Sequence, residues 1–216
     1  MCKPASLANN TSILLLQLSL LTFCIARMKG FDAYTSDGVQ GKYEILGDDM
    51  QLLTVNLKDG EKLTCEPGSM SFMSNDVNAG VNCDACCNRC MGGNPCIMST
   101  YTGGSDESYV ALSPKLPAKI VPIDCSTLNG QAMRCKSGTF LGHIGDVNLN
   151  FDFDFNCITC CCAGQGCVRQ KVDGTGSAFL FAMGTILTKE LAEGEVLVID
   201  TNSVVGWQES VQLGIK

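Results

Sequence analysis

Apolar and polar residues alternate along several stretches of the chain, which is the pattern of β-strands with one buried face. The clearest stretch is Phe151–Phe155, where three phenylalanines would lie on one face and two aspartates on the other. Between such stretches stand Asp59-Gly60, Asn129-Gly130 and Glu193-Gly194, pairs that suit the positive φ angles of hairpin turns. No stretch has sustained helical periodicity with caps, so we expect few and short helices. The pattern predicts an all-β fold.

The strand–turn–strand pattern occurs three times, near residues 52–81, 122–151 and 186–215. The first and third copies align without a gap, and their identical residues include the turn glycines Gly60 and Gly194. The middle copy is a weaker match to the first. Because such a repeat is the signature of a fold built from similar units, we expect one three-repeat domain over residues 42–216.

The third copy reaches the end of the sequence before its second half. Residues 42–55 align without a gap against residues 176–189. We therefore expect residues 42–55 to complete the third copy and to close the ring of repeats, which would also leave fewer exposed sheet edges.

Composition narrows the classes of function. Of 216 residues, 45% are apolar and 17% are charged, which argues against wholesale disorder and allows a hydrophobic core. The formal net charge is −7 and no cluster of Lys and Arg is present, so we expect no nucleic-acid partner. Protein partners, self-association, a membrane surface and small molecules stay open.

The first 28 residues form a separate apolar segment. Lys3 precedes an apolar run from Ile13 to Ala26, and Arg27 follows it. The run is shorter than the roughly 20 residues of a membrane-spanning helix, and its order of basic, apolar and small residues matches a secretory signal. Three interpretations stay open: a signal or anchor, an extended start upstream of Met28, and a mitochondrial targeting segment.

Several motifs within residues 42–211 resemble one protein family and occur in the same order. They are YEILGDDMQLL, LKDGEKL with PGSM behind it, GTFLG, VDGTGSAFLFAMGTI and LAEGEVLVIDTNSVVGW. These motifs resemble the altered inheritance of mitochondria protein 24 family. The resemblance implies a TRAP-like, double-stranded β-helix type of β-sandwich with pseudo-three-fold internal repeats. It also implies a mitochondrial or membrane-associated location, since fungal members are mitochondrial and linked to inner-membrane organisation. It implies no catalytic residues.

The chain departs from this family in two cysteine-rich loops, which hold ten of its 15 cysteines. The first cluster is Cys83, Cys86, Cys87, Cys90 and Cys96, and the second is Cys157, Cys160, Cys161, Cys162 and Cys167. The repeat alignment places both clusters in equivalent loops. Both contain C-x-x-C, the spacing with which two thiolates reach one ion from a tight turn. Because tetrahedral sulfur sites most often hold zinc, all ten are candidate ligands of structural zinc.

Three other interpretations of the cysteines compete with zinc. Consecutive cysteines in an apolar loop also suit S-acylation, which would anchor the domain to a membrane. Disulfides become the better interpretation if the N-terminal segment is a working secretory signal. The cysteines could also be thiols without a special role.

Other candidates for chemistry are few. His143 is the only histidine and is expected at the surface or in a loop, so histidine-based triads and multi-histidine metal sites are excluded. The segment Gly174-Thr175-Gly176 lacks the full phosphate-loop pattern and is expected to be a turn. Asp152 and Asp154 are expected on a solvated strand face, and Trp207 in the core or an interface. Glu61 and Glu195 stand in the repeated turn, which indicates a structural role.

The sequence therefore predicts a protein without enzymatic activity. The first hypothesis is a scaffold or interaction domain, associated with a membrane in some settings, whose cysteine loops bind zinc structurally. The alternative is a redox or metal-handling protein in which the cysteine loops are the functional site.

Overall fold

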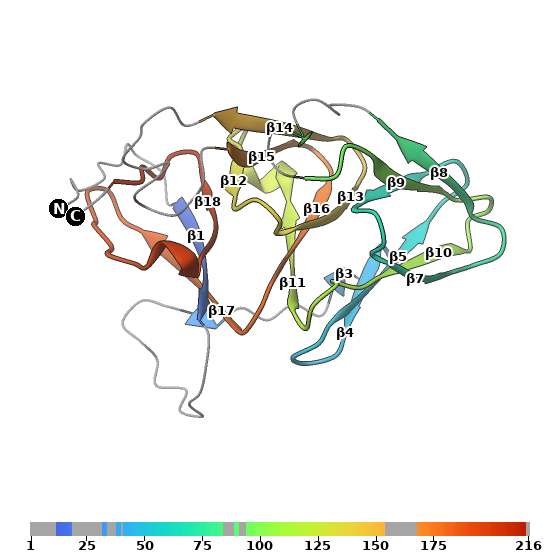
Figure 1. The fold of residues 1–216 in the computed structure, drawn as a ribbon, viewed down its shortest axis with the longest axis horizontal. Helices are drawn as coiled ribbons and strands as arrows, with labels where there is room; N and C mark the ends of the chain where they lie inside the picture. Colours follow the sequence, from blue (N-terminus) through green and yellow to red (C-terminus); the bar gives the residue numbers. More distant parts are fainter. Residues whose placement is uncertain are drawn as a thin grey trace.

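The computed structural model describes residues 12–18, 32–33, 38–39, 41–83, 89–90, 94–153 and 168–214, and their strands form three antiparallel sheets (Figure 1). The five-stranded sheet contains, in spatial order, β3 (Gly38–Val39), β4 (Tyr43–Leu46), β5 (Leu52–Leu57), β10 (Ser108–Leu112) and β7 (Met70–Met73). The six-stranded sheet contains β11 (Lys119–Asp124), β16 (Ser177–Ala182), β13 (Phe140–Ile144), β6 (Lys62–Cys65), β9 (Met98–Thr102) and β8 (Asn78–Asn82). The seven-stranded sheet contains β14 (Val147–Phe153), β15 (Val168–Gly174), β12 (Met133–Cys135), β18 (Val204–Gln208), β1 (Ser12–Leu18), β17 (Thr185–Leu191) and β2 (Asp32–Ala33).

The predicted all-β sandwich fold is confirmed, and the helical content is small. In the described part of the chain it consists of the 3-10 segments η1 (Cys125–Leu128) and η3 (Thr201–Ser203) and a short turn at residues 89–90. An aspartate caps each 3-10 segment, because the side chains of Asp124 and Asp200 accept hydrogen bonds from the backbone two residues later.

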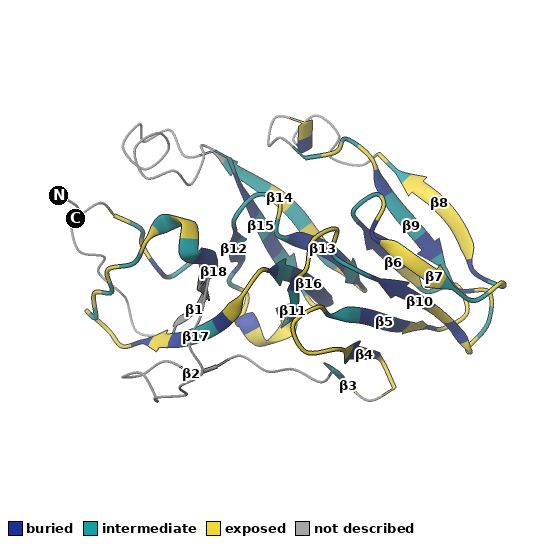
Figure 2. Ribbon diagram, turned by 60° about the horizontal axis from the view of Figure 1, so that its bottom comes forward, coloured by how far each residue is buried: buried dark blue, intermediate teal, exposed yellow. Residues whose placement is uncertain are grey.

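Three apolar cores hold the sheets together. The first lies between the five- and six-stranded sheets and includes Leu53 and Phe179. The second lies between the six- and seven-stranded sheets and includes Met133 and Leu180. The third packs around Trp207 at the far end of the molecule. Figure 2 shows the buried residues along the inner strands, whereas β7 and β8 are largely exposed.

One arrangement of three strands is found in each sheet. In the five-stranded sheet β10 lies between β5 and β7, in the six-stranded sheet β16 lies between β11 and β13, and in the seven-stranded sheet β1 lies between β17 and β18. Each central strand has a register shift against the third strand, at Ala111/Leu112, at Phe140/Gly142 and at Leu15/Leu16. A bulge at the same place in all three indicates the same local twist.

The expectation that residues 42–55 complete the third copy is wrong. β4 pairs with β3 and β5, because a short turn at Gly47–Met50 joins it directly to β5 in a hairpin. The place beside β17 and β18 is filled by β1, which pairs with β17 over its whole length. This strand comes from the apolar segment for which the sequence suggested a signal or anchor.

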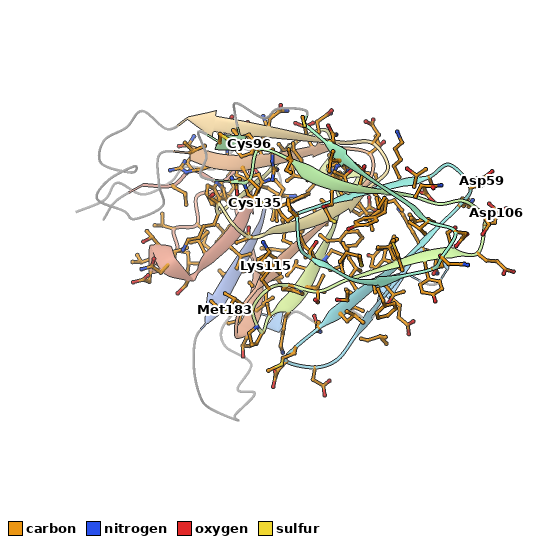
Figure 3. All side chains as sticks on the ribbon, turned by 45° about the vertical axis from the view of Figure 1, so that its right-hand side comes forward. Asp59, Cys96, Asp106, Lys115, Cys135 and Met183 are labelled. Carbon is orange, nitrogen blue, oxygen red and sulfur yellow. A yellow bond between two sulfur atoms is a disulfide. The ribbon has the colours of Figure 1, made fainter. Side chains whose placement is uncertain are left out.

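The glycine turns are present, but they are not hairpins. Gly60, Gly130 and Gly194 have φ angles of 74°, 76° and 76°. The first two turns lead from one sheet into the next, since β5 and β6 belong to different sheets and so do β11 and β12. The turns therefore form corners of the sandwich. Figure 3 shows Asp59 and Asp106 side by side at the first corner, where the Asp59 backbone N–H donates to Asp106 Oδ1 at 3.2 Å.

Candidate functional site: the cysteine-rich loops

The structure describes three of the ten predicted metal ligands. Cys83 is a free, exposed cysteine after β8. Cys90 and Cys96 are joined in a disulfide, with their Cα atoms 5.3 Å apart. The other seven lie outside the described residues: Cys86, Cys87, Cys157, Cys160, Cys161, Cys162 and Cys167. Within the described ranges, no three or more His, Cys, Asp or Glu side chains are grouped so that they could hold a metal ion.

The disulfide changes the interpretation of the first cluster. Zinc binds thiolates, and the two sulfurs of a disulfide carry none. For Cys90 and Cys96 the structure therefore shows the disulfide alternative in place of metal ligation. Zinc ligation by the remaining members of the two clusters stays a prediction.

Arg89, beside the disulfide, anchors the first loop to the sheets. Its side chain is 1% exposed, and its Nη2 donates to Glu66 Oε1 at 2.5 Å. Its Nε donates to the Pro95 carbonyl oxygen at 2.9 Å, and its own carbonyl oxygen accepts from the Asn94 N–H at 2.9 Å. A charge-assisted hydrogen bond and two loop hydrogen bonds thus converge on one buried arginine, which holds the loop against the body of the protein.

The loop rests on two turns that have the same construction. Glu66 begins the turn after β6, in which Ser69 Oγ donates to the Glu66 carbonyl at 2.7 Å. Lys136 begins the turn after β12, in which Thr139 Oγ1 donates to the Lys136 carbonyl at 2.8 Å. Asn94 Nδ2 donates to Ser137 Oγ in this second turn at 3.4 Å. The first cysteine loop therefore bridges the six-stranded and seven-stranded sheets.

The remaining described cysteines are buried and chemically quiet. Burial raises the pKa of the Cys65 and Cys125 thiols to about 11. It raises the pKa of the Cys135 thiol further, since this side chain is fully enclosed. These thiols stay protonated near neutral pH, which makes them poor nucleophiles there. Figure 3 shows Cys96 nearer the edge of the molecule than Cys135.

The lone histidine lies inside a strand and not in a loop. His143 belongs to β13 and is half-buried, with the Phe140 ring centroid 6.2 Å from its own. Burial lowers the pKa of His143 to about 4, so the ring is neutral at pH 7. The expected loop position is therefore wrong: His143 lies within β13, which pairs with β16 and β6, and its side chain is half-buried rather than fully at the surface.

Other residues take structural roles, as predicted. Trp207 is fully buried, with the Arg169 guanidinium 5.5 Å from its ring centroid. Glu61 and Glu195 each accept a hydrogen bond at 3.0 Å from the backbone N–H three residues earlier, and so brace their turns. Asp152 was expected on a solvated strand face, but it is partly buried and its Oδ2 accepts from Arg134 Nε at 3.0 Å; Asp154 lies outside the described residues.

The segment at residues 174–176 is a turn, as expected. The backbone N–H groups of Thr175 and Gly176 both donate to the Asp146 carbonyl oxygen at 2.8 Å. These donors already have a partner inside the protein, so they are not presented to a phosphate.

Sequence reasoning missed the Arg89–Glu66 pair. The signal available was a single arginine inside a cysteine cluster whose only other charged residue is Asp84. An arginine in such a loop lies either in solvent or against an opposite charge, and the sequence does not decide between these positions or name the partner. The partner lies 23 residues away, beyond any local pattern.

Comparison with known proteins agrees with this architecture. A family model described as Mitochondrial biogenesis AIM24 matches residues 43–216. The chain belongs to the AIM24 family. No curated protein matches the sequence at a significant level. In the described parts of this AIM24-family chain, no helix has the length and apolar character needed to cross a membrane.

A solved structure shows the same fold. It is the X-ray crystal structure of protein SPYM3_0169 from Streptococcus pyogenes, which superposes on the AIM24-family chain with a TM-score of 0.52 at 16% sequence identity. The match covers 66% of this chain and 65% of that one, so the chain spans about two thirds of the bacterial protein's length. At this identity the likeness concerns the fold alone.

Proposed function

We propose that this AIM24-family protein is a non-catalytic scaffold that acts in mitochondrial biogenesis by binding other protein surfaces. The observation that carries the proposal is an exposed apolar patch at the end of the five-stranded sheet. Phe72 and Tyr109 are 48% and 40% exposed, and their rings meet edge to face with centroids 6.3 Å apart. Met70 beside them is 37% exposed. Exposed aromatic and methionine side chains on one face are typical of contact surfaces between proteins.

In this proposal the cysteine loops are structural. The first loop is braced by the Cys90–Cys96 disulfide and by the buried Arg89–Glu66 pair. In this proposal zinc is bound by the cluster cysteines outside the disulfide. These are Cys83, Cys86, Cys87 and the five cysteines of the second cluster. A metal assay on protein purified without chelator tests this part. We expect about one equivalent of zinc per chain, and less than about half an equivalent contradicts it.

The alternative function is redox or metal handling through the cysteine loops. The observation in its favour is the free, exposed Cys83 in the same loop as the Cys90–Cys96 disulfide. An exposed thiol near a disulfide can attack it and exchange partners.

Complementation separates the two functions. In cells lacking their own copy of this protein, a scaffold requires the apolar patch, so the double variant Phe72→Lys with Tyr109→Lys fails to restore mitochondrial function. The variant Cys90→Ser with Cys96→Ser, if it folds, restores it. A redox or metal-handling protein gives the reverse result. Circular dichroism and expression level confirm that each variant is folded and present.

A further inference from the structure

The three groups of three strands are joined to one another at two junctions, and both junctions are built in the same way. The strand after the first corner, β6, pairs antiparallel with β13, and the strand after the second corner, β12, pairs antiparallel with β18. The registers agree residue for residue, since Cys65 lies opposite Gly142 and Cys135 opposite Gly206. In each group of three strands described above, the outer side of the third strand therefore pairs with a strand from the preceding group. That strand is the one that follows the preceding group's glycine corner: β6 for β13, and β12 for β18.

This construction leaves one segment unpaired at the end of the chain. Residues 196–199 follow the third corner, after β17 and Gly194, but within the described ranges they pair with no strand. Leu197 and Ile199 stand where β6 has Leu63 and Cys65, and both pack against the core around Trp207. The segment thus has the inward-facing apolar residues of β6 without a strand beside it.

The outward positions of this segment are apolar as well. Val196 is 49% exposed and Val198 is 61% exposed. The corresponding positions in β6 carry Lys62 and Thr64. A run of valine, leucine and isoleucine with one face in solvent has high propensity to join a sheet.

This construction also leaves one strand edge open at the other end of the fold. β7 pairs with β10 and, among the described strands, has no neighbour on its outer side. Its unpaired backbone groups and the exposed Phe72 are the features of an edge that accepts a further strand. The equivalent strands β13 and β18 both have a second neighbour.

The open edge and the unpaired segment cannot meet within one chain. In Figure 1, β7 lies at the right of the molecule, and the red chain that joins β17 to β18 lies at the left. Figure 2, from another side, shows the same separation. A second copy of the chain can bring the two together, because each copy offers one donor segment and one acceptor edge.

We propose that residues 196–199 of one copy pair antiparallel with β7 of the next copy, in the register of the two internal junctions. Ile199 then lies opposite Phe72, and Val198 opposite Met73. Such a head-to-tail contact uses two different surfaces, so it continues from copy to copy and gives chains or closed rings rather than dimers. The inference rests on the proposed scaffold function and names its partner as the protein itself.

The contact between copies is weaker than the internal junctions. A Cβ atom at Gly142 would lie 3.0 Å from the Cys65 Cβ and 2.9 Å from the Thr64 carbonyl oxygen, so these strands approach closely because of the glycine. β7 carries Phe72 at the matching position, which holds the partner strand farther away. We therefore expect reversible association that depends on protein concentration.

Sedimentation velocity on the full chain tests the proposal between about 1 and about 500 μM, the range in which moderate protein contacts dissociate. We expect the mean mass of the unmodified protein to rise past that of a dimer. A parallel run with a reducing agent excludes oligomers held by intermolecular disulfides. Val198→Lys blocks the donor segment and Phe72→Lys blocks the acceptor edge, so each variant alone is expected to sediment as a single chain.

Mixing the two variants gives the decisive measurement. The free edge of Val198→Lys can accept the intact segment of Phe72→Lys, so an equimolar mixture forms dimers and nothing larger. The matched control is Val81→Lys, which places the same charge on a valine that is 70% exposed in β8 and should associate like the unmodified protein. Thermal unfolding shows that all three variants are folded.

Three results would overturn the proposal. These are a single-chain mass for the unmodified protein at every concentration, unchanged association of Val198→Lys, and a mixture that stays monomeric. The scaffold function fails separately. If the unmodified protein is monomeric but the patch variant still does not complement, the scaffold stands and its partner is another protein.

Discussion

β7 and β18 hold the same place in the pairing scheme, yet their environments are opposite. β18 lies between β12 and β1, and all five of its residues are buried. β7 pairs with β10 alone, and three of its four residues are exposed. Equivalent positions thus hold Trp207, which is fully buried in the third core, and Met73, which is only partly buried against the first core. The difference shows that the burial of a strand here depends on its neighbours, and that each unit is completed by strands from elsewhere in the chain.

Removal of β1 should have the largest effect, because it would make β18 an edge strand like β7. Deletion of residues 1–27 removes the partner of β17 and β18 and leaves two rows of unpaired backbone groups. We expect a loss of more than about 5 kcal/mol in the free energy of unfolding, enough to prevent stable folding. Circular dichroism and urea titration measure it.

Deletion of residues 1–11 is the matched control for this experiment, since β1 begins at Ser12. Its urea midpoint should equal that of the full chain. If the longer deletion also keeps the full-length midpoint, β1 does not contribute to the stability of the sheet.

The second test compares the equivalent residues directly. Trp207→Ala opens a cavity in the third core and removes the contact with Arg169, so we expect a loss of about 3–5 kcal/mol in the free energy of unfolding. Met73→Ala, which removes a partly buried side chain that packs against the first core, should cost less, about 1–2 kcal/mol. Urea midpoints of both variants give the values, and equal losses would contradict the comparison.

The third test concerns His143 in β13, which holds the position equivalent to Met73 in β7 and Trp207 in β18. Because burial lowers the pKa of His143 to about 4 from its ordinary 6.5, the unfolded chain binds a proton that the folded chain excludes between these pH values. The stability that this group provides is complete above pH 6.5 and is lost as the pH falls toward 4, by up to about 3 kcal/mol.

His143→Met, which introduces the residue found in β7, should remove this part of the pH dependence. Urea unfolding of both proteins at pH 7 and pH 4.5 measures it. If the two proteins lose the same free energy of unfolding on acidification, His143 does not have the lowered pKa.

The smallest expected loss of stability comes from the first cysteine loop, whose described contacts are with the turns after β6 and β12 rather than with β7 or β18. Cys90→Ser with Cys96→Ser opens a short loop that the Arg89–Glu66 pair still holds, so we expect a loss of less than about 2 kcal/mol. Urea unfolding and the rate of proteolysis within the loop measure the effect. Cys83→Ser is the exposed control and should change neither, whereas global unfolding of the double variant would contradict the local role.

The strands and turns were predictable because their signals are local. Alternating residues predicted strands, and acidic-Gly and Asn-Gly pairs predicted turns with positive φ, which the structure has at Gly60, Gly130 and Gly194. The partners of the strands were not predictable in the same way. A turn into the next sheet and a hairpin turn use the same residues, so the sequence could not tell that β5 and β6 lie in different sheets.

The identity of β1 illustrates a second limit. A short apolar run with few charges has the same composition in a signal sequence and in a β-strand, and periodicity does not separate them. Likewise, the spacing of Cys90 and Cys96 suits a disulfide as well as a metal site. The Arg89–Glu66 pair depends on a contact between distant segments, which no local pattern reports.

The position of β1 also has a consequence for how the protein folds. Residues 12–18 are made well before their partners at residues 185–191 and 204–208. The pairing of β1 therefore closes a long loop of chain, which is a slow step, and an apolar segment must wait unpaired during synthesis. Until the C-terminal strands emerge, that segment is available to chaperones and to any translocation machinery that binds apolar segments.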